Sequence, residues 1–163
     1  MIIRKHLDAR KTFLTVYFLA FAVYIIIGLQ PAQAQNYDVS GSLSIPVIGL
    51  TSDVTTLELK DKKLDTPDTI VGSYSRVDSK VLLIGHSTTV FQDLDKVTLG
   101  DEIVYNDKTY YVDDITTLKK EEISMTNLLQ REDKDTLVVM TCAGELLGEG
   151  EATHRLIITA SVR

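Results

Sequence analysis

The sequence predicts a mainly β domain, either a barrel or a sandwich, with one or two short helices and an apolar segment in front of it. Short segments rich in β-branched residues recur along residues 43–163, turn-forming Gly, Asn and Asp separate them, and few stretches have helical periodicity. The length of 163 residues suits one domain plus a short appendage.

The N-terminal segment has the pattern of a membrane anchor. Residues 1–11 are basic, and residues 12–29 contain no charged side chain, where a bilayer span needs at least roughly 17 apolar residues. The basic flank predicts a cytoplasmic N-terminus, a single span over residues 12–29, a polar tether over 30–42 and an extracellular domain. The alternative is a signal peptide cleaved after Ala34, although the apolar run exceeds the roughly 7–15 residues of a signal core.

The elements of the domain follow in order. Strands are predicted over residues 43–49, 54–59, 81–86, 102–105, 109–115, 136–142 and 155–162. Residues 106–108 (Asn-Asp-Lys) have the chemistry of a hairpin turn between two of them. One or two helical turns are expected over residues 91–97, and a helix over 121–130 would place Met125, Leu128 and Leu129 on one face.

The only cysteine, Cys142, is predicted at the end of a strand, before a loop with three glycines, and Arg155 begins the next strand. If these strands are neighbours, the loop folds back and brings Arg155 towards Cys142. A lone cysteine is often a buried small hydrophobe. In an exported chain, however, an odd cysteine indicates intermolecular pairing or a reactive thiol, and a nearby base or cation favours the thiolate.

Three histidines could serve as that base. His6 precedes the apolar segment and would lie on the wrong side of the membrane. His154 adjoins Arg155, and strand alternation points the two side chains to opposite faces. His86 ends a predicted strand and precedes a polar loop, as Cys142 does, so it is the preferred partner.

The strand ending Ile84-Gly85-His86, the later strand ending Thr141-Cys142 and the arginine that opens the last strand together resemble the sortases, the cysteine transpeptidases of bacterial cell surfaces. Residues 45–50 (Ile-Pro-Val-Ile-Gly-Leu) resemble the opening of the sortase domain, and residues 91–94 and 99–103 resemble the Phe-x-x-Leu and Gly-Asp segments after the family's histidine. The chain departs from the family where Val138-Val139-Met140 replaces the frequent Thr-Leu-x, and where residues 73–76 lack a Pro-Gly-Asn pattern.

The resemblance implies a closed sortase-type β-barrel over residues 43–163, with a catalytic trio. Cys142 would form a thioester with a Leu-Pro-x-Thr-Gly-like sorting signal of a surface protein, and His86 would act as general acid and base. Arg155 would hold the substrate backbone and the oxyanion, and Thr141 is a candidate substrate-binding residue. The acceptor would be an amine on a peptidoglycan precursor or a pilin.

Other functions are less compatible with the sequence. A net charge of -6 and a pI near 5.0 argue against nucleic acid as a partner. The glutamates Glu145, Glu149 and Glu151 indicate a solvated acidic loop; calcium is possible there, but no metal or cofactor is assigned. Two alternatives stay open, namely an anchored β-barrel binding module with an inert cysteine and an L,D-transpeptidase, whose cysteine follows His-Gly where this chain has Met140-Thr141.

Overall fold

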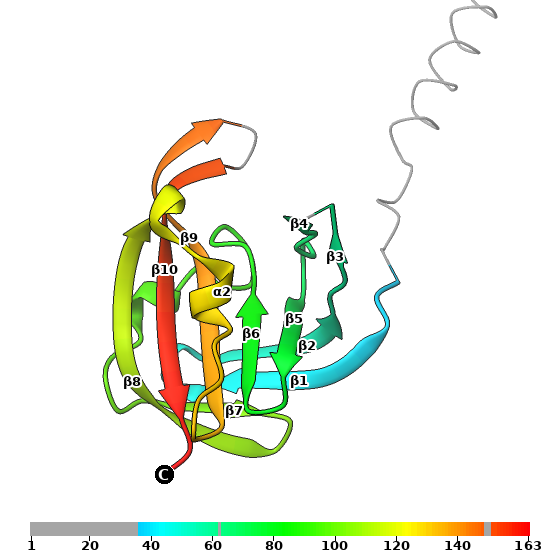
Figure 1. Ribbon diagram of the computed structural model, residues 1–163, viewed down its shortest axis with the longest axis vertical. Helices are drawn as coiled ribbons and strands as arrows, with labels where there is room; N and C mark the ends of the chain where they lie inside the picture. Colours follow the sequence, from blue (N-terminus) through cyan, green and yellow to red (C-terminus); the bar gives the residue numbers. More distant parts are fainter. Residues whose placement is uncertain (1–35, 62, 149–150) are drawn as a thin grey trace, which may run out of the picture. The chain divides into compact units, whose positions relative to one another are not determined.

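A closed barrel forms the body of the domain (Figure 1). The computed structural model describes residues 36–61, 63–148 and 151–163. Around the barrel the strands follow in the order β1 (Val39–Ile45), β2 (Leu50–Thr56), β5 (Val71–Val77), β6 (Lys80–Ile84), β9 (Thr136–Gly148), β10 (Glu151–Ser161), β8 (Lys108–Lys119) and β7 (Glu102–Tyr105), which pairs with β1. The pairs β2–β5 and β6–β9 are parallel, whereas the other neighbours are antiparallel. The prediction of a mainly β, closed barrel with few short helices is confirmed.

Every predicted strand corresponds to an observed one, and β7 has the predicted bounds. The first predicted strand is wrong at both ends. The observed strand β1 begins at Val39, inside the expected tether, because β1 pairs along its length with β2. It ends at Ile45, because Pro46 has no backbone N–H for the ladder and starts the 3-10 turn η1 (Pro46–Ile48), which Gly49 ends with φ 63°.

Two elements were not predicted. A two-stranded sheet, β3 (Leu59–Lys60) with β4 (Lys63–Leu64), lies outside the barrel order. The barrel strand β5 consists largely of small and polar residues, so it lacks the apolar pattern of a buried strand. Its buried Gly72 leaves room for Leu57, whose side chain would lie 2.5 Å from an added Cβ.

The helices are shorter than the sequence predicts. In place of a helix over residues 121–130, the chain forms the 3-10 turn η3 (Lys120–Glu122) and a single turn of α-helix, α2 (Met125–Leu128). Ile123 is extended between them, and Ser124 caps α2 by accepting a hydrogen bond from the Asn127 N–H at 3.4 Å. The turn expected over residues 91–97 is η2 (Leu94–Lys96).

Two apolar clusters occupy the two faces of the strands. The larger cluster takes residues from every barrel strand and therefore fills the barrel; Leu83 of β6 and Val139 of β9 belong to it. The smaller cluster takes the alternate residues, Leu82 and Ile84 of β6 and Val138 of β9, and packs against α2. It therefore lies on the outer face of β6 and β9, and this face leads to the site described below.

The predicted anchor over residues 12–29 lies outside the described residues. In the part of the chain that the structure describes, no helix is long and apolar enough to span a bilayer.

Candidate active site

The parallel pair β6–β9 brings His86 and Cys142 to the same end of the barrel. Ile84 lies beside Met140 in the register, and both strands run in the same direction, so His86 and Cys142 each follow two residues later. Because side chains alternate along a strand, these two residues continue the outer face that Ile84 and Met140 belong to. The backbone holds this arrangement, since the Gly85 N–H donates to the Met140 carbonyl at 3.4 Å.

Arg155 is the direct cross-strand neighbour of Cys142 in the antiparallel pair β9–β10. Side chains of directly opposed residues lie on the same face, about 4.5–5.5 Å apart at their Cβ atoms. Arg155 Nη1 donates to the Ala152 carbonyl at 2.9 Å and to the His154 carbonyl at 2.8 Å. These two bonds fix the guanidinium against its own strand. The expectation that the two strands are neighbours and bring Arg155 to Cys142 is therefore confirmed.

One hollow of about 490 Å³ is lined by Cys142, His86 and Arg155 together. Its other walls come from two segments of the chain. The segment between β2 and β5 provides Leu59, Lys63, Leu64 and Thr66, and the segment between β8 and β9 provides Lys120, Ile123 and Met125. Ile84 and Met140 also line it, so the hollow continues the outer apolar face. Cys142 is half-buried and its thiol is free, so it combines an apolar setting with access from the hollow.

His86 is held by the loop that follows it and by the segment before β5. Its backbone carbonyl accepts from the Phe91 N–H at 3.0 Å and from the Thr89 N–H at 3.3 Å. On the side chain, Nε2 lies 3.3 Å from the Thr66 carbonyl and 3.8 Å from the Asp68 carboxylate. Both partners accept, so they favour a ring that carries a proton on Nε2.

The segment Thr66-Pro67-Asp68 was not predicted as part of the site. Its Pro67 is a turn signal in the sequence, but no local pattern shows that this turn reaches a histidine twenty residues later. The hairpin β3–β4 was missed for the same reason.

His154 does not line the hollow. Its Nδ1 lies 2.7 Å from Thr153 Oγ1, and the alternation predicted for His154 and Arg155 agrees with the absence of His154 from the lining. Of the two histidines within the described residues, His86 is the one beside Cys142.

Thr141, the candidate substrate-binding residue, lies at the edge of this hollow and uses its hydroxyl in a bond within the protein. Its side chain is buried, with 4% of the residue exposed, and Oγ1 donates to the Gly85 carbonyl at 2.8 Å. The residue lines the hollow, but its hydroxyl joins β9 to the end of β6. This hydrogen bond links the residue before Cys142 to the residue before His86.

The predicted strand end at Cys142 is wrong, because β9 continues to Gly148 as one arm of a hairpin with β10. The ladder is instead interrupted between Ala143 and Leu146, where β9 has one residue more than β10. Gly144 allows this bulge with φ 78°, and a Cβ there would lie 2.5 Å from Thr153 Oγ1. Cys142 therefore lies one residue pair before a bulge in the ladder. A bulge changes the direction of the neighbouring side chains, as the end of a strand would.

The acidic loop was the place where calcium was considered. Glu149 lies outside the described residues, and the side chain of Glu151 is not described. Among the described residues there is no group of three or more His, Cys, Asp or Glu side chains that could hold a metal ion.

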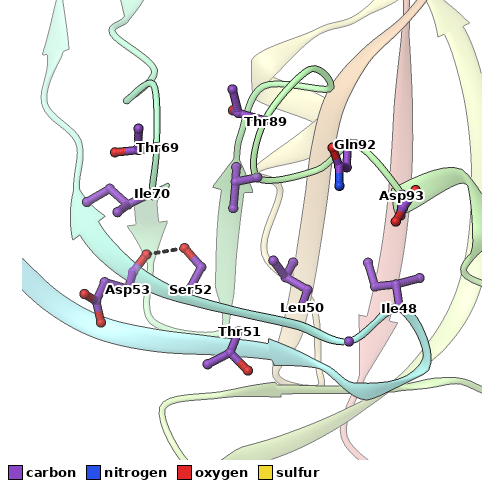
Figure 2. Close-up of a pocket in the computed structure, with 12 residues that line it drawn as sticks. Ile48, Leu50, Thr51, Ser52, Asp53, Thr69, Ile70, Thr89, Gln92 and Asp93 are labelled. Atoms are coloured by element: carbon purple, nitrogen blue, oxygen red, sulfur yellow. Dashed lines mark hydrogen bonds between the residues drawn. The ribbon is translucent and has the colours of Figure 1, made fainter. Parts of the chain in front are cut away.

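A second hollow, of about 480 Å³, lies away from this trio. Figure 2 shows Ile48 and Leu50 at its base, with Thr69 and Ile70 on one side and Gln92 and Asp93 on the other. Neither a cysteine nor a histidine nor an arginine is among its described lining residues, whereas Cys142, His86 and Arg155 all line the first hollow.

Comparison with known proteins gives a family. A family model described as a sortase domain matches residues 43–163. A comparison with curated proteins found no match.

Solved structures with the same fold are sortases of several classes. Sortase C1 from Streptococcus agalactiae is 28% identical, with a TM-score of 0.58 over 83% of this chain and 72% of that chain. Sortase A from Corynebacterium diphtheriae, a lid mutant, is 25% identical, with a TM-score of 0.60 over 79% of this chain and 72% of that chain. Sortase C-1 from Actinomyces oris is 25% identical, with a TM-score of 0.58 over 81% of each chain.

Proposed function

The chain belongs to the sortase family of cysteine transpeptidases, and from this premise we propose that Cys142, His86 and Arg155 are its catalytic residues. The observation that supports this assignment is that all three residues line one hollow on the outer face of the barrel. His86 follows β6, Cys142 lies in β9 and Arg155 lies in β10. A binding module with an inert cysteine and an L,D-transpeptidase do not account for the family match over residues 43–163.

Each residue has a chemical role in a two-step acyl transfer. The Cys142 thiolate attacks the carbonyl of the scissile peptide bond, and the bond to the leaving amine breaks, which gives a thioester. His86 gives a proton to the departing amine and takes one from the incoming acceptor amine. The acceptor then forms a new amide bond and releases the Cys142 thiolate, while His86 keeps the proton of the acceptor for the next cycle.

Arg155 supplies a positive charge and hydrogen-bond donors with a fixed orientation. Two bonds through Nη1 to backbone carbonyls preorganise its guanidinium, which carries five N–H donors in a fixed plane. The donors not used in these bonds stabilise the oxyanion that develops on the attacked carbonyl. The Cα pairing of Arg155 with Cys142 puts the two residues side by side across the β9–β10 ladder, where both face the same hollow.

The substrates and the location follow from the family and from the sequence. The donor is a surface protein with a Leu-Pro-x-Thr-Gly-like sorting signal, and the acceptor is an amine on a peptidoglycan precursor or a pilin. The uncharged run over residues 12–29 with its basic flank supports a single-pass anchor in the cell membrane, with the catalytic barrel outside the cell.

The test uses the full-length chain in detergent micelles, with sorting peptides and a peptide that has a free amine. Mass spectrometry should detect the amine adduct or the hydrolysed donor, and a thioester on Cys142 when the acceptor is omitted. Cys142→Ala should keep the circular dichroism spectrum and lose all conversion. The cysteine mechanism would be excluded if the alanine variant converted peptide. It would also be excluded if the unaltered chain cleaved peptide and no thioester formed on it.

A further inference from the structure

The segment between β4 and β5 holds the ring of His86. Nε2 of this ring lies 3.3 Å from the Thr66 carbonyl and 3.8 Å from a carboxylate oxygen of Asp68. Pro67, between these two residues, is buried and restricts Thr66 to an extended backbone conformation. The Thr66 carbonyl therefore keeps a fixed direction, and it presents an acceptor to the ring from the wall of the hollow.

Asp68 is itself fixed by a residue just before β1. Its backbone N–H donates to the Tyr37 hydroxyl at 3.3 Å. The residue after Tyr37 is joined to the barrel, because the Asp38 carbonyl accepts from Thr55 Oγ1 at 2.7 Å. Thr55 is a buried residue of the barrel strand β2. A path of bonds therefore leads from the barrel wall through Tyr37 to Asp68.

The contacts of the ring decide which of its nitrogens can work as acid and base. A carbonyl and a carboxylate both accept, so Nε2 carries a proton in the neutral ring as well as in the imidazolium. Nδ1 is the nitrogen that remains for proton transfer. Asp68 does not line the hollow, so its carboxylate does not occupy the place of a substrate. A carboxylate in this position fixes the orientation and the tautomer of the ring, as the aspartate of a Ser-His-Asp triad does.

We propose that Asp68 is a positioning residue for His86, that Tyr37 keeps Asp68 in place, and that Nδ1 of His86 gives and takes the proton. The inference rests on the proposed function, since it concerns the histidine of the same reaction. In the first step Nδ1 of the imidazolium passes its proton to the departing amine, which leaves a neutral ring with Nε2–H bound to the Thr66 carbonyl. In the second step Nδ1 takes a proton from the acceptor amine, and the imidazolium forms again.

The first experiment measures the tautomer directly. Nitrogen NMR of the full-length chain with isotope-labelled histidines, in detergent micelles at alkaline pH, distinguishes Nε2–H from Nδ1–H by the long-range couplings of the ring. The signals of His86 are those that disappear in His86→Gln. The Nε2–H form should dominate in the unaltered chain, and its share should fall in Asp68→Asn, because the amide carries no charge. A dominant Nδ1–H form in the unaltered chain would overturn the inference.

Kinetics then show whether the position of the ring matters for the reaction. The Asp68 side chain is 81% exposed, so Asp68→Asn should lower kcat for peptide conversion by only about two- to fivefold and leave the KM unchanged. Asp68→Glu keeps a carboxylate and should recover part of this loss. Asp65→Asn is the matched control and should have a normal kcat. Asp65 is exposed in the same segment, and it has no hydrogen bond or ion pair among the residues that the structure describes.

Tyr37→Phe tests the link from the barrel wall. This variant keeps the aromatic ring and loses the hydroxyl that accepts from Asp68, so kcat should fall by a similar factor. Tyr105→Phe, at a half-buried tyrosine of β7, should be normal. If Tyr37 acts through the Asp68 carboxylate, the double variant of Tyr37→Phe and Asp68→Asn should be no slower than Asp68→Asn alone. Losses that multiply in the double variant would refute this role of Tyr37.

The outcomes separate this inference from the proposed function. If Asp68→Asn converts peptide as fast as the unaltered chain, the positioning inference is wrong and the transpeptidase assignment stands. If Asp65→Asn is as slow as Asp68→Asn, general surface charge explains the loss and the positioning inference is equally wrong. If no peptide is cleaved and no thioester forms on Cys142, the proposed function fails and this inference fails with it, whichever tautomer the ring has.

Discussion

Replacement of Thr141 by valine should weaken the connection between the two strand ends that carry His86 and Cys142. Thr141 Oγ1 donates to the Gly85 carbonyl at 2.8 Å, and both residues are buried. Valine has nearly the same shape but no donor, so a buried carbonyl loses this partner. A buried acceptor left unsatisfied costs about 1–3 kcal/mol in the free energy of unfolding. The variant should still fold, because domains have about 5–15 kcal/mol of stability.

The kinetic effect should exceed the effect on stability. Gly85 and Thr141 each directly precede a proposed catalytic residue, so a shift between them moves the imidazole relative to the sulfur. A displacement of about 1 Å can cost a hundredfold in rate. We therefore expect kcat for peptide conversion to fall by about ten- to a hundredfold. The KM should change little, and Thr141→Ser should keep both rate and stability.

Thr136→Val is the matched control. Thr136 lies in the same strand, is also buried, and donates through Oγ1 to the Lys134 carbonyl at 3.0 Å, but it is the first residue of β9 and lies away from the hollow. Urea unfolding should give a similar loss of stability with a normal kcat. If Thr141→Val kept its kcat and raised the KM, Thr141 would be a substrate-binding residue as first predicted. If the two valine variants had equal rates, the positioning role would be refuted.

Four further predictions concern single side chains. Cys142→Ala should abolish peptide exchange and leave the fold intact, since the half-buried sulfur contributes little packing; exchange by the purified variant would contradict this. The rate should have a bell-shaped dependence on pH, because a thiolate and an imidazolium must coexist; His86→Ala should remove one limb and nearly all activity, and the same result with His154→Ala would reassign the base. Arg155→Lys should label normally with an alkylating agent at Cys142 but convert peptide at least about a hundredfold more slowly, so near-native conversion would make Arg155 structural. Burial raises the pKa of Tyr110 above 10.0, so this phenol favours folding below that pH and the contribution is lost as the pH rises further; Tyr110→Phe should therefore flatten the alkaline loss of stability in urea titrations, and an unchanged slope would contradict it.

The sequence predicted His86, Cys142 and Arg155 because each of them adjoins a run of residues that is typical of a strand. His86 and Cys142 follow runs of β-branched and apolar residues, and such runs identify strands without knowledge of their partners. The pairing of β9 with β10 could be expected from their adjacency in the chain. The continuation of β9 past Cys142 could not, because three glycines indicate a loop, whereas in the structure Gly144 serves a bulge.

The walls of the site could not be predicted, since they depend on contacts between distant segments. Strand β5 has a polar sequence, and its burial follows from neighbours such as Thr55, whose carbonyl accepts a hydrogen bond from Ser73 Oγ at 3.2 Å. The helix over residues 121–130 was predicted from one apolar face. That face does cover the outer cluster through Leu128 and Leu129, but an extended Ile123 and a capping Ser124 break the helix before it.

The two faces of β6 and β9 have different roles, because one packs into the core of the barrel and the other leads to the proposed catalytic residues. Leu83 and Val139 point into the cluster that fills the barrel, and each is fully buried there, so truncating either one should cost about 2–5 kcal/mol. His86 and Cys142 continue the opposite face, which leads from the outer cluster to an open hollow. His86 and Cys142 are only half-buried there, so their replacement costs the barrel little packing, unlike that of the buried Leu82 and Val138 on the same face. The register between the two strands is the one feature that both faces share, and Thr141, buried yet bonded to Gly85, is placed to hold it.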